Sequence, residues 1–193
     1  APADGLTILA TNYPDLNMTI ANDAPYDVGD FVPIAVELKD PRIIMVPKNS
    51  PFETLSDFID VAIENPGSIS VSVTQGGAQD LLGQWLMHKL KDLGADFRIT
   101  GYDSGGDAAT AMTSGHVDAT IGDDLARYNL RDEAKVLAIA SEAPSDRWPE
   151  GKTLESQLKD YGIEMPAPDF LARYKIYAVK KEVKEEYPER FEI

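Results

Sequence analysis

The sequence contains no cysteine and only two histidines, and these scarcities exclude several kinds of chemistry. Without cysteine there is neither a disulfide framework nor a thiol nucleophile. His88 and His116 lack a neighbouring serine–aspartate or glutamate pattern, so neither is expected to serve as a catalytic base. No Gly-x-Ser-x-Gly motif of a hydrolase occurs either. We therefore expect a binding protein, with no cofactor, and not an enzyme.

Basic residues are also scarce. The 193 residues include 18 Lys and Arg against 33 Asp and Glu, which gives a formal net charge of -15. Nucleic acids and anionic membrane surfaces are held by cationic side chains, so neither is an expected partner. The acidic residues are scattered along the chain and are typical of a solvated acidic surface. An anionic ligand would therefore have to be held by backbone N–H groups and helix N-termini.

Long apolar runs are absent as well. No stretch approaches the roughly 20 apolar residues that a membrane-spanning helix needs. The opening residues Ala1-Pro2-Ala3-Asp4 lack the basic start and apolar run of a signal peptide. A mature or trimmed protein would look the same, so this start does not identify the compartment.

Short apolar runs instead alternate with segments of helical periodicity, which is typical of βαβ units. We expect strands at residues 6–10, 31–38, 43–46, 69–73, 97–100, 117–121, 135–140 and 174–179. Helices are expected at residues 54–64, 79–93, 107–114, 153–160 and 181–190. The alternation predicts an α/β protein with a mainly parallel sheet.

Two glycine turns connect a predicted strand to a predicted helix: Gln75-Gly76-Gly77 and Gly101 to Gly106. Each turn could present backbone N–H groups and a helix N-terminus to an anion. Each could equally be a tight turn that needs the positive φ of glycine. Neither has the spacing of a phosphate-binding loop or of a dinucleotide fingerprint. On consecutive units of a parallel sheet the two turns would lie side by side, at the edge where such sheets bind ligands.

Other residues are weaker candidates for a site. Asp118, Asp123 and Asp124 lack the ligand spacing of a known metal-binding loop, so no metal is expected. Trp85, Met87 and Leu90 recur at helical spacing and are interpreted as core residues.

Several stretches, taken in order, resemble a known family. "SPFETLSDFIDVAIENPGSISVSVTQGG", "GYDSGGDAATAMTSGHVDATIGD" and "DRWPEGKTLES" are similar to the substrate-binding proteins of tripartite tricarboxylate transporters, also called Bug receptors. The start, "PADGLTIL", is similar to the Pro-Asp-Gly-Tyr-Thr-Leu-Leu of that family. Each motif is weak alone, but together they cover nearly the whole chain in the right order.

The resemblance implies a periplasmic-binding-protein-like (type II) fold, with two α/β lobes that close on a small mono-, di- or tricarboxylate. Residues 1–47 would be a fragment of the first lobe, 48–170 a nearly complete second lobe and 171–193 the return crossover. The family begins and ends with segments that this sequence does not contain, so a truncated first lobe is expected. The resemblance further implies an extracytoplasmic receptor, acting as a monomer, that passes its ligand to integral membrane transporter subunits.

Ligand-binding positions are expected from the glycine turns together with the resemblance. They are Thr11, Asn12, Thr74, Gln75, Gly76, Gly77, Ala78, Tyr102, Ser104, Gly105, Gly106 and Asp123. Ser104 replaces a lysine of the family pattern, Ala78 replaces a serine, and Asp80-Leu81 stand where a histidine is usual. These departures favour backbone contacts over side-chain contacts. They also leave open another two-lobed receptor, of the ABC type, for an amino acid or a cation.

Overall fold

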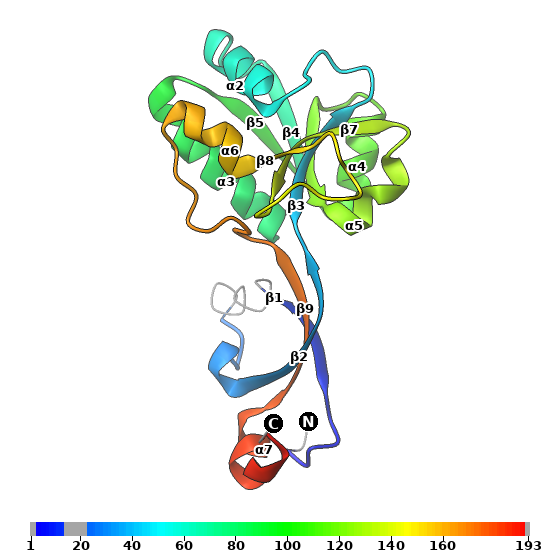
Figure 1. The fold of residues 1–193 in the computed structure, drawn as a ribbon, viewed down its shortest axis with the longest axis vertical. Coiled ribbons are helices and arrows are strands. Elements are labelled where there is room, and N and C mark those ends of the chain that lie inside the picture. Colours follow the sequence, from blue (N-terminus) through cyan, green and yellow to red (C-terminus); the bar gives the residue numbers. More distant parts are fainter. Residues whose placement is uncertain (1–2, 14–22, 192–193) are drawn as a thin grey trace. The chain divides into compact units, whose positions relative to one another are not determined.

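The computed structural model describes residues 3–13 and 23–191, and the chain divides into two units. One unit combines Ala1–Lys39 with Arg173–Ile193, and the other is Asp40–Ala172 (Figure 1). The sequence placed the boundaries after residues 47 and 170. The strand at 42–47 belongs to the larger unit because it pairs on both sides with strands of that unit.

The smaller unit is built on a three-stranded sheet in the order β1-β9-β2. Its strands are β1 (Leu9–Tyr13), β2 (Phe31–Asp40, of which Asp40 belongs to the larger unit) and β9 (Arg173–Lys180). β1 runs antiparallel to β9. The 3-10 turns η2 (Val28–Asp30) and η6 (Pro188–Arg190) and the helix α7 (Lys181–Glu186) complete the unit. The first strand begins at Leu9, three residues later than predicted.

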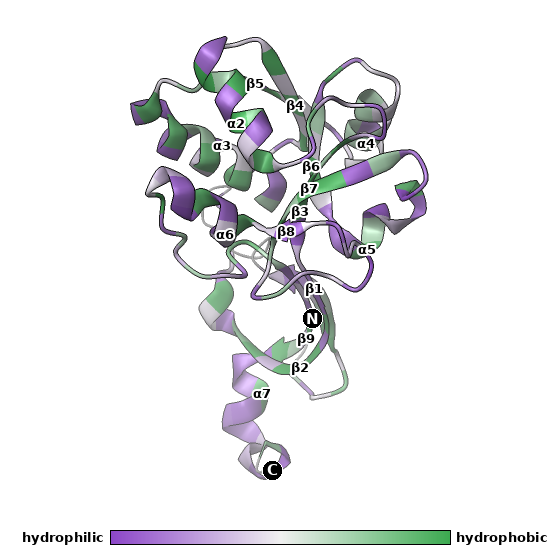
Figure 2. Ribbon diagram, turned by 45° about the horizontal axis from the view of Figure 1, so that its top comes forward, coloured by the Kyte–Doolittle hydropathy of each residue, from purple (hydrophilic) through white to green (hydrophobic). Residues whose placement is uncertain are grey.

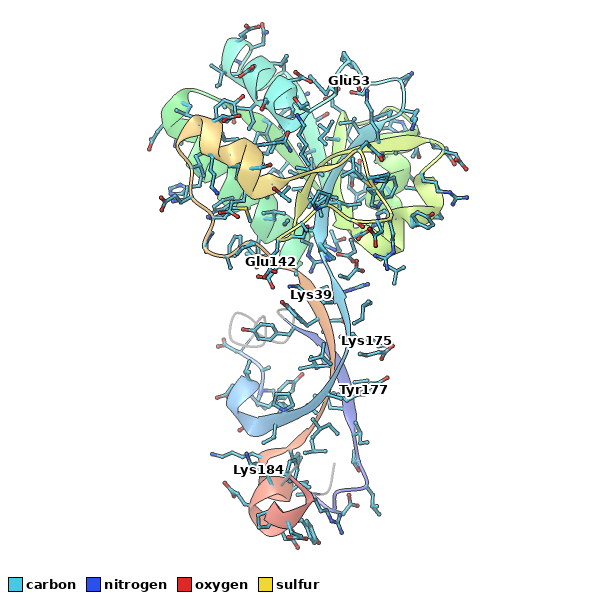
Figure 3. All side chains as sticks on the ribbon, in the orientation of Figure 1. Lys39, Glu53, Glu142, Lys175, Tyr177 and Lys184 are labelled. Atoms are coloured by element: carbon cyan, nitrogen blue, oxygen red, sulfur yellow. The ribbon has the colours of Figure 1, made fainter. Side chains whose placement is uncertain are left out.

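One side of this sheet carries a polar cluster. Glu37 of β2 accepts hydrogen bonds from the Lys175 ammonium at 3.0 Å and from the Tyr177 hydroxyl. Lys175 and Tyr177 are two residues apart on β9, so their side chains project from the same face (Figure 3). Several large apolar side chains of the unit are exposed, among them Ile8 and Val36.

The larger unit contains a six-stranded sheet in the order β5-β4-β6-β3-β7-β8. The strands are β3 (Arg42–Pro47), β4 (Ile69–Thr74), β5 (Phe97–Tyr102), β6 (Ala119–Asp123), β7 (Ala134–Ala140) and β8 (Lys152–Thr153). β4 runs parallel to both β5 and β6, as the alternating pattern predicted.

β3 departs from the parallel arrangement, because it runs antiparallel to both β6 and β7. Only Pro41 separates it from β2, which belongs to the three-stranded sheet, so no crossover within the six-stranded sheet precedes it. The sheet is therefore mixed, with one antiparallel strand between parallel neighbours. The strand is buried on both faces, with Ile44 and Val46 in one core and Ile43 and Met45 in the other.

Helices cover both faces of this sheet. They are α2 (Leu55–Glu64), α3 (Ala78–Leu90), α4 (Gly105–Thr113), α5 (Asp124–Arg127) and α6 (Leu154–Leu158), with 3-10 turns η3 (Lys91–Leu93), η4 (Tyr128–Leu130) and η5 (Lys159–Tyr161). Residues of α2, α3 and α6 share the larger core, whereas α4 packs in the second core beside Trp148. Apolar colouring is concentrated on the central strands, while α7 is mostly hydrophilic (Figure 2). Within the described residues, no helix has the length and apolar character to cross a membrane.

Candidate ligand-binding site

The first glycine turn joins β4 to α3. The Gln75 N–H donates to the Tyr102 carbonyl at 2.9 Å, which ties this turn to the end of β5. Gly76 has a φ of +67°, so the left-handed backbone falls at this glycine. Gly77 is the N-cap of α3 at a φ of -92°, and no side chain caps the helix there. The first N–H groups of α3, including that of Ala78, thus have no intrahelical acceptor.

An acidic side chain of the same helix lies across this turn. The Asp80 carboxylate accepts from the Gly76 N–H at 3.0 Å and from the Gln84 amide at 3.4 Å. One backbone donor of the turn is therefore already used by the chain's own carboxylate. The other backbone donors at this turn are the first N–H groups of α3.

The second glycine turn joins β5 to α4. Ser104 is the N-cap: its Oγ accepts from the Asp107 N–H at 3.1 Å, and its hydroxyl donates to the Asp107 carboxylate at 2.7 Å. Gly105 and Gly106 are the first two residues of α4, and neither has a positive φ. The helix was predicted to begin at Asp107, so the two glycines lie in its first turn and not in a preceding loop. Their N–H groups face out of the helix end without an intrahelical acceptor.

The two turns are adjacent because β4 and β5 are parallel neighbours in register from Ile69 and Phe97 to Thr74 and Tyr102. The sequence predicted this adjacency, and the strand pairing confirms it. The turns and the first helical residues after them, 74–80 and 101–107, include Asp80, Asp103 and Asp107 but no lysine or arginine. Any positive side chain at this edge must come from another element.

Arg42 of β3 is one such side chain. Arg42 and Asp123 stand opposite each other in the antiparallel β3–β6 register, and their side chains form an ion pair buried at 1% and 8% relative exposure. The Gln79 amide also donates to Asp123, at 3.2 Å. Asp123 was predicted in a turn after the strand, but it is the last residue of β6. Arg42 on the neighbouring strand β3 thereby neutralises the negative charge of the Asp123 carboxylate.

Arg127 of α5 is the second buried cation, with 8% relative exposure. Its Nη2 donates to the Gly105 carbonyl. A Cβ atom on Gly105 would overlap this nitrogen, and a Cβ on Gly122 would lie 2.8 Å from Arg127 Cγ. At both glycines the absence of a Cβ leaves room for the close approach of Arg127, and neither has a positive φ.

Sequence reasoning missed Arg42, Gln79 and Arg127. The one available signal was Arg42, a charged residue that opens a strongly apolar strand between two prolines. Nothing in the local pattern around Arg127 indicated burial, because its partner Gly105 lies on another βα unit.

Thr11 and Asn12 lie in the smaller unit, on β1, opposite Ile176 and Lys175 of β9. Thr11 also lines a cavity of about 620 Å³ in this unit, together with Tyr26. Their assignment to the ligand site rests on the resemblance alone. Within the residues that the structure describes, no group of three or more His, Cys, Asp or Glu side chains is arranged to hold a metal ion.

The larger unit thus has two adjacent helix N-termini at the carboxyl ends of parallel strands, where open α/β sheets bind their ligands. Residues 1–173 match the tripartite tricarboxylate transporter family receptor, described as TctC, and the chain belongs to this family. No curated protein matches the sequence.

Solved structures of this class share the fold. A TctC solute-binding protein from Polaromonas has a TM-score of 0.75 at 21% identity, over 96% of this chain and 61% of its own. A protein of R. palustris with adipate has a TM-score of 0.73 at 19% identity, over 96% of this chain and 61% of its own. MatC of Rhodopseudomonas palustris with bound malate has a TM-score of 0.70 at 19% identity, over 96% of this chain and 62% of its own. The chain thus has the periplasmic-binding-protein-like fold and spans about three fifths of the length of these proteins, in keeping with partial lobes.

Proposed function

We propose that this protein is an extracytoplasmic receptor that binds a small mono-, di- or tricarboxylate. It delivers this ligand, as a monomer, to the integral membrane subunits of a tripartite tricarboxylate transporter. The observation that carries the proposal is the pairing of the turns at residues 74–78 and 102–106, tied by the hydrogen bond from Gln75 to Tyr102. In a member of this receptor family, two such turns form a natural anion site.

Main-chain donors account for anion binding in an acidic protein. The helices α3 and α4 begin directly after adjacent parallel strands, and each contributes its first N–H groups and the positive end of its dipole. Asp123 does not oppose an anion with a full charge, because Arg42 pairs with it. Ser104 caps α4, so it contributes to the site by fixing the shape of the turn. It does not supply the positive charge of the lysine that it replaces in the family pattern.

The solved structures with adipate and malate support a carboxylate ligand, since they show the same fold with such molecules bound. The alternative is an ABC-type receptor for an amino acid or a cation. It is favoured by one observation: Asp80, Asp103 and Asp107 accompany the two turns without any basic residue.

A thermal-shift screen of the protein tests the proposal against this alternative. The screen compares mono-, di- and tricarboxylates with amino acids and polyamines. Carboxylates should raise the melting temperature, because a ligand that binds only the folded state stabilises it. A shift with polyamines alone would overturn the carboxylate assignment. Deletion of the gene should then abolish uptake of the selected carboxylate while growth on sugars continues.

A further inference from the structure

We propose that Arg127 is a positioning residue for the ligand site, which aligns and polarises the Gly105–Gly106 peptide group. Its guanidinium is buried and donates to the Gly105 carbonyl. This contact deepens the proposed function, because it provides a positive charge that neither glycine turn contains.

The argument begins with the covalent structure of the backbone. The Gly105 carbonyl and the Gly106 N–H belong to one planar peptide group, so a change at the oxygen is felt at the nitrogen. Hydrogen bonds polarise one another along a chain, and a charged donor strengthens this effect. A guanidinium on the Gly105 oxygen therefore makes the Gly106 N–H a stronger donor to an anion.

The surroundings of Arg127 fix this geometry. The side chain passes Gly122, where a Cβ would lie 2.8 Å from its Cγ and 2.9 Å from its Nε. It ends beside Gly105, where a Cβ would overlap Nη2 and lie 3.4 Å from the Thr74 hydroxyl oxygen. Arg127 thus links the carboxyl end of β6 to the first turn of α4, and Thr74 of β4 lies at the same point.

The local charge also gives Arg127 a function in binding. A cation near a helix N-terminus opposes the helix dipole, and so does not stabilise α4 by this route. A carboxylate at the Gly105 and Gly106 N–H groups would interact favourably with both the dipole and the guanidinium. The arrangement is better suited to a bound anion than to stability alone.

The first test is independent of any ligand. Nuclear magnetic resonance would follow the backbone amide signals of Gly105 and Gly106 in the parent, Arg127→Lys and Arg127→Met proteins. The matched control is Arg131→Met, because Arg131 is half-exposed and stacks on Tyr128 in the neighbouring turn. We expect the Gly106 signal to move in Arg127→Met, to move less in Arg127→Lys and to stay in place in the control. An unchanged Gly106 signal in Arg127→Met would overturn the inference.

A second variant serves if Arg127→Met fails to fold. Gly105→Ala places a methyl group against Nη2 and displaces the guanidinium, whereas Gly106→Ala places it 3.6 Å from the nearest atom, Ser104 Oγ. We expect Gly105→Ala to reproduce the Gly106 shift. Equal, small shifts throughout α4 in both alanine variants would contradict the contact.

The binding test uses adipate, its monoamide and its diamide, which have similar length and decreasing charge. If the parent binds adipate, Arg127→Met should weaken this binding about tenfold, and Arg127→Lys should recover part of the loss. The preference for adipate over its diamide should shrink in Arg127→Met, which a purely structural role would not cause. If the parent binds no carboxylate, the proposed function fails, while the amide signals still decide the role of Arg127. An unchanged preference would remove the role in binding.

Discussion

Arg42 and Asp123 face each other across two antiparallel strands and form a buried ion pair at the edge of the larger sheet where we propose that the ligand binds. Arg42 Nε also donates to the Leu171 carbonyl at 2.7 Å. Each side chain therefore neutralises the charge of the other. Arg42 also ties the segment after η5 to β3 through its hydrogen bond to Leu171. The pair explains how an aspartate can lie beside a proposed anion site.

Removal of either partner should destabilise the protein by about 3–5 kcal/mol, since it leaves the other charge buried without its counter-ion. The measurement is the free energy of unfolding by urea for Arg42→Met and Asp123→Leu. The double variant should be less destabilised than the sum of the two. Additive losses would mean that the two charges are not coupled.

The cap of α4 makes a second prediction. Ser104→Ala should cost about 1 kcal/mol of stability, because the Asp107 N–H loses its acceptor. Gly106→Ala should leave stability unchanged or raise it by about 0.5–1 kcal/mol, since the site has an ordinary φ and a Cβ there would make an ordinary contact, 3.6 Å from Ser104 Oγ. Thermal unfolding compares the two, with Gly76→Ala as the control that strains a positive φ. A more damaging Gly106→Ala would contradict the observed backbone.

Tyr161 provides a prediction for alkaline pH. Burial, followed by the hydrogen bond to Asp60 at 2.7 Å, raises the pKa of Tyr161 to about 12. The ordinary pKa of tyrosine is about 10. Because the folded state raises the pKa of Tyr161, its protonated hydroxyl contributes fully to stability below a pH of about 10. This contribution is lost as the pH rises from about 10 through the folded pKa.

The measurement is an ultraviolet titration of the parent against Tyr161→Phe, which isolates the signal of this residue. Asp60→Asn should lower the pKa of Tyr161, because the neighbouring negative charge is removed. If Tyr161 titrates near its ordinary pKa in both the parent and Asp60→Asn, the contact to Asp60 is absent in solution.

The two units should differ in amide hydrogen exchange. The smaller unit has a three-stranded sheet with exposed apolar side chains such as Val36, which is 60% exposed, and both of its outer strands are edges. We expect β1 and β2 to exchange faster than β3 and β4, which lie inside the six-stranded sheet. Uniform protection would mean that a further segment or a partner covers the smaller sheet.

Much of this fold could be predicted from local patterns. Helix α2 was predicted at residues 54–64 from its helical periodicity, and the structure has it at Leu55–Glu64 with Thr54 as its N-cap. The strands β4 and β5 were recognised from their apolar character. Their parallel pairing followed from the intervening helix. These elements were predictable because neighbouring residues determine them.

The remaining features depend on contacts between distant residues. The antiparallel direction of β3 is fixed by its pairing with β6 and β7, which no local pattern encodes. The start of α4 was placed too late because glycine is a poor helix former, whereas Arg127 and Ser104 hold these glycines in the first turn. The Arg42–Asp123 pair likewise required the strand register. The binding assignments of Thr11, Asn12 and the glycine turns stay predictions.

The central claim is that the backbone of the glycine turns, and not a side chain, holds the carboxylate. Titration calorimetry of the parent, Gly106→Val and Ser104→Ala, with the carboxylate chosen by the thermal-shift screen, tests it most directly. We expect Gly106→Val to weaken binding about tenfold or more, because the side chain covers a main-chain donor worth about 1.5–3 kcal/mol to an anion. Ser104→Ala should retain the parent affinity within about threefold once the melting temperatures are compared. Parent affinity in Gly106→Val together with loss of binding in Ser104→Ala would contradict backbone capture.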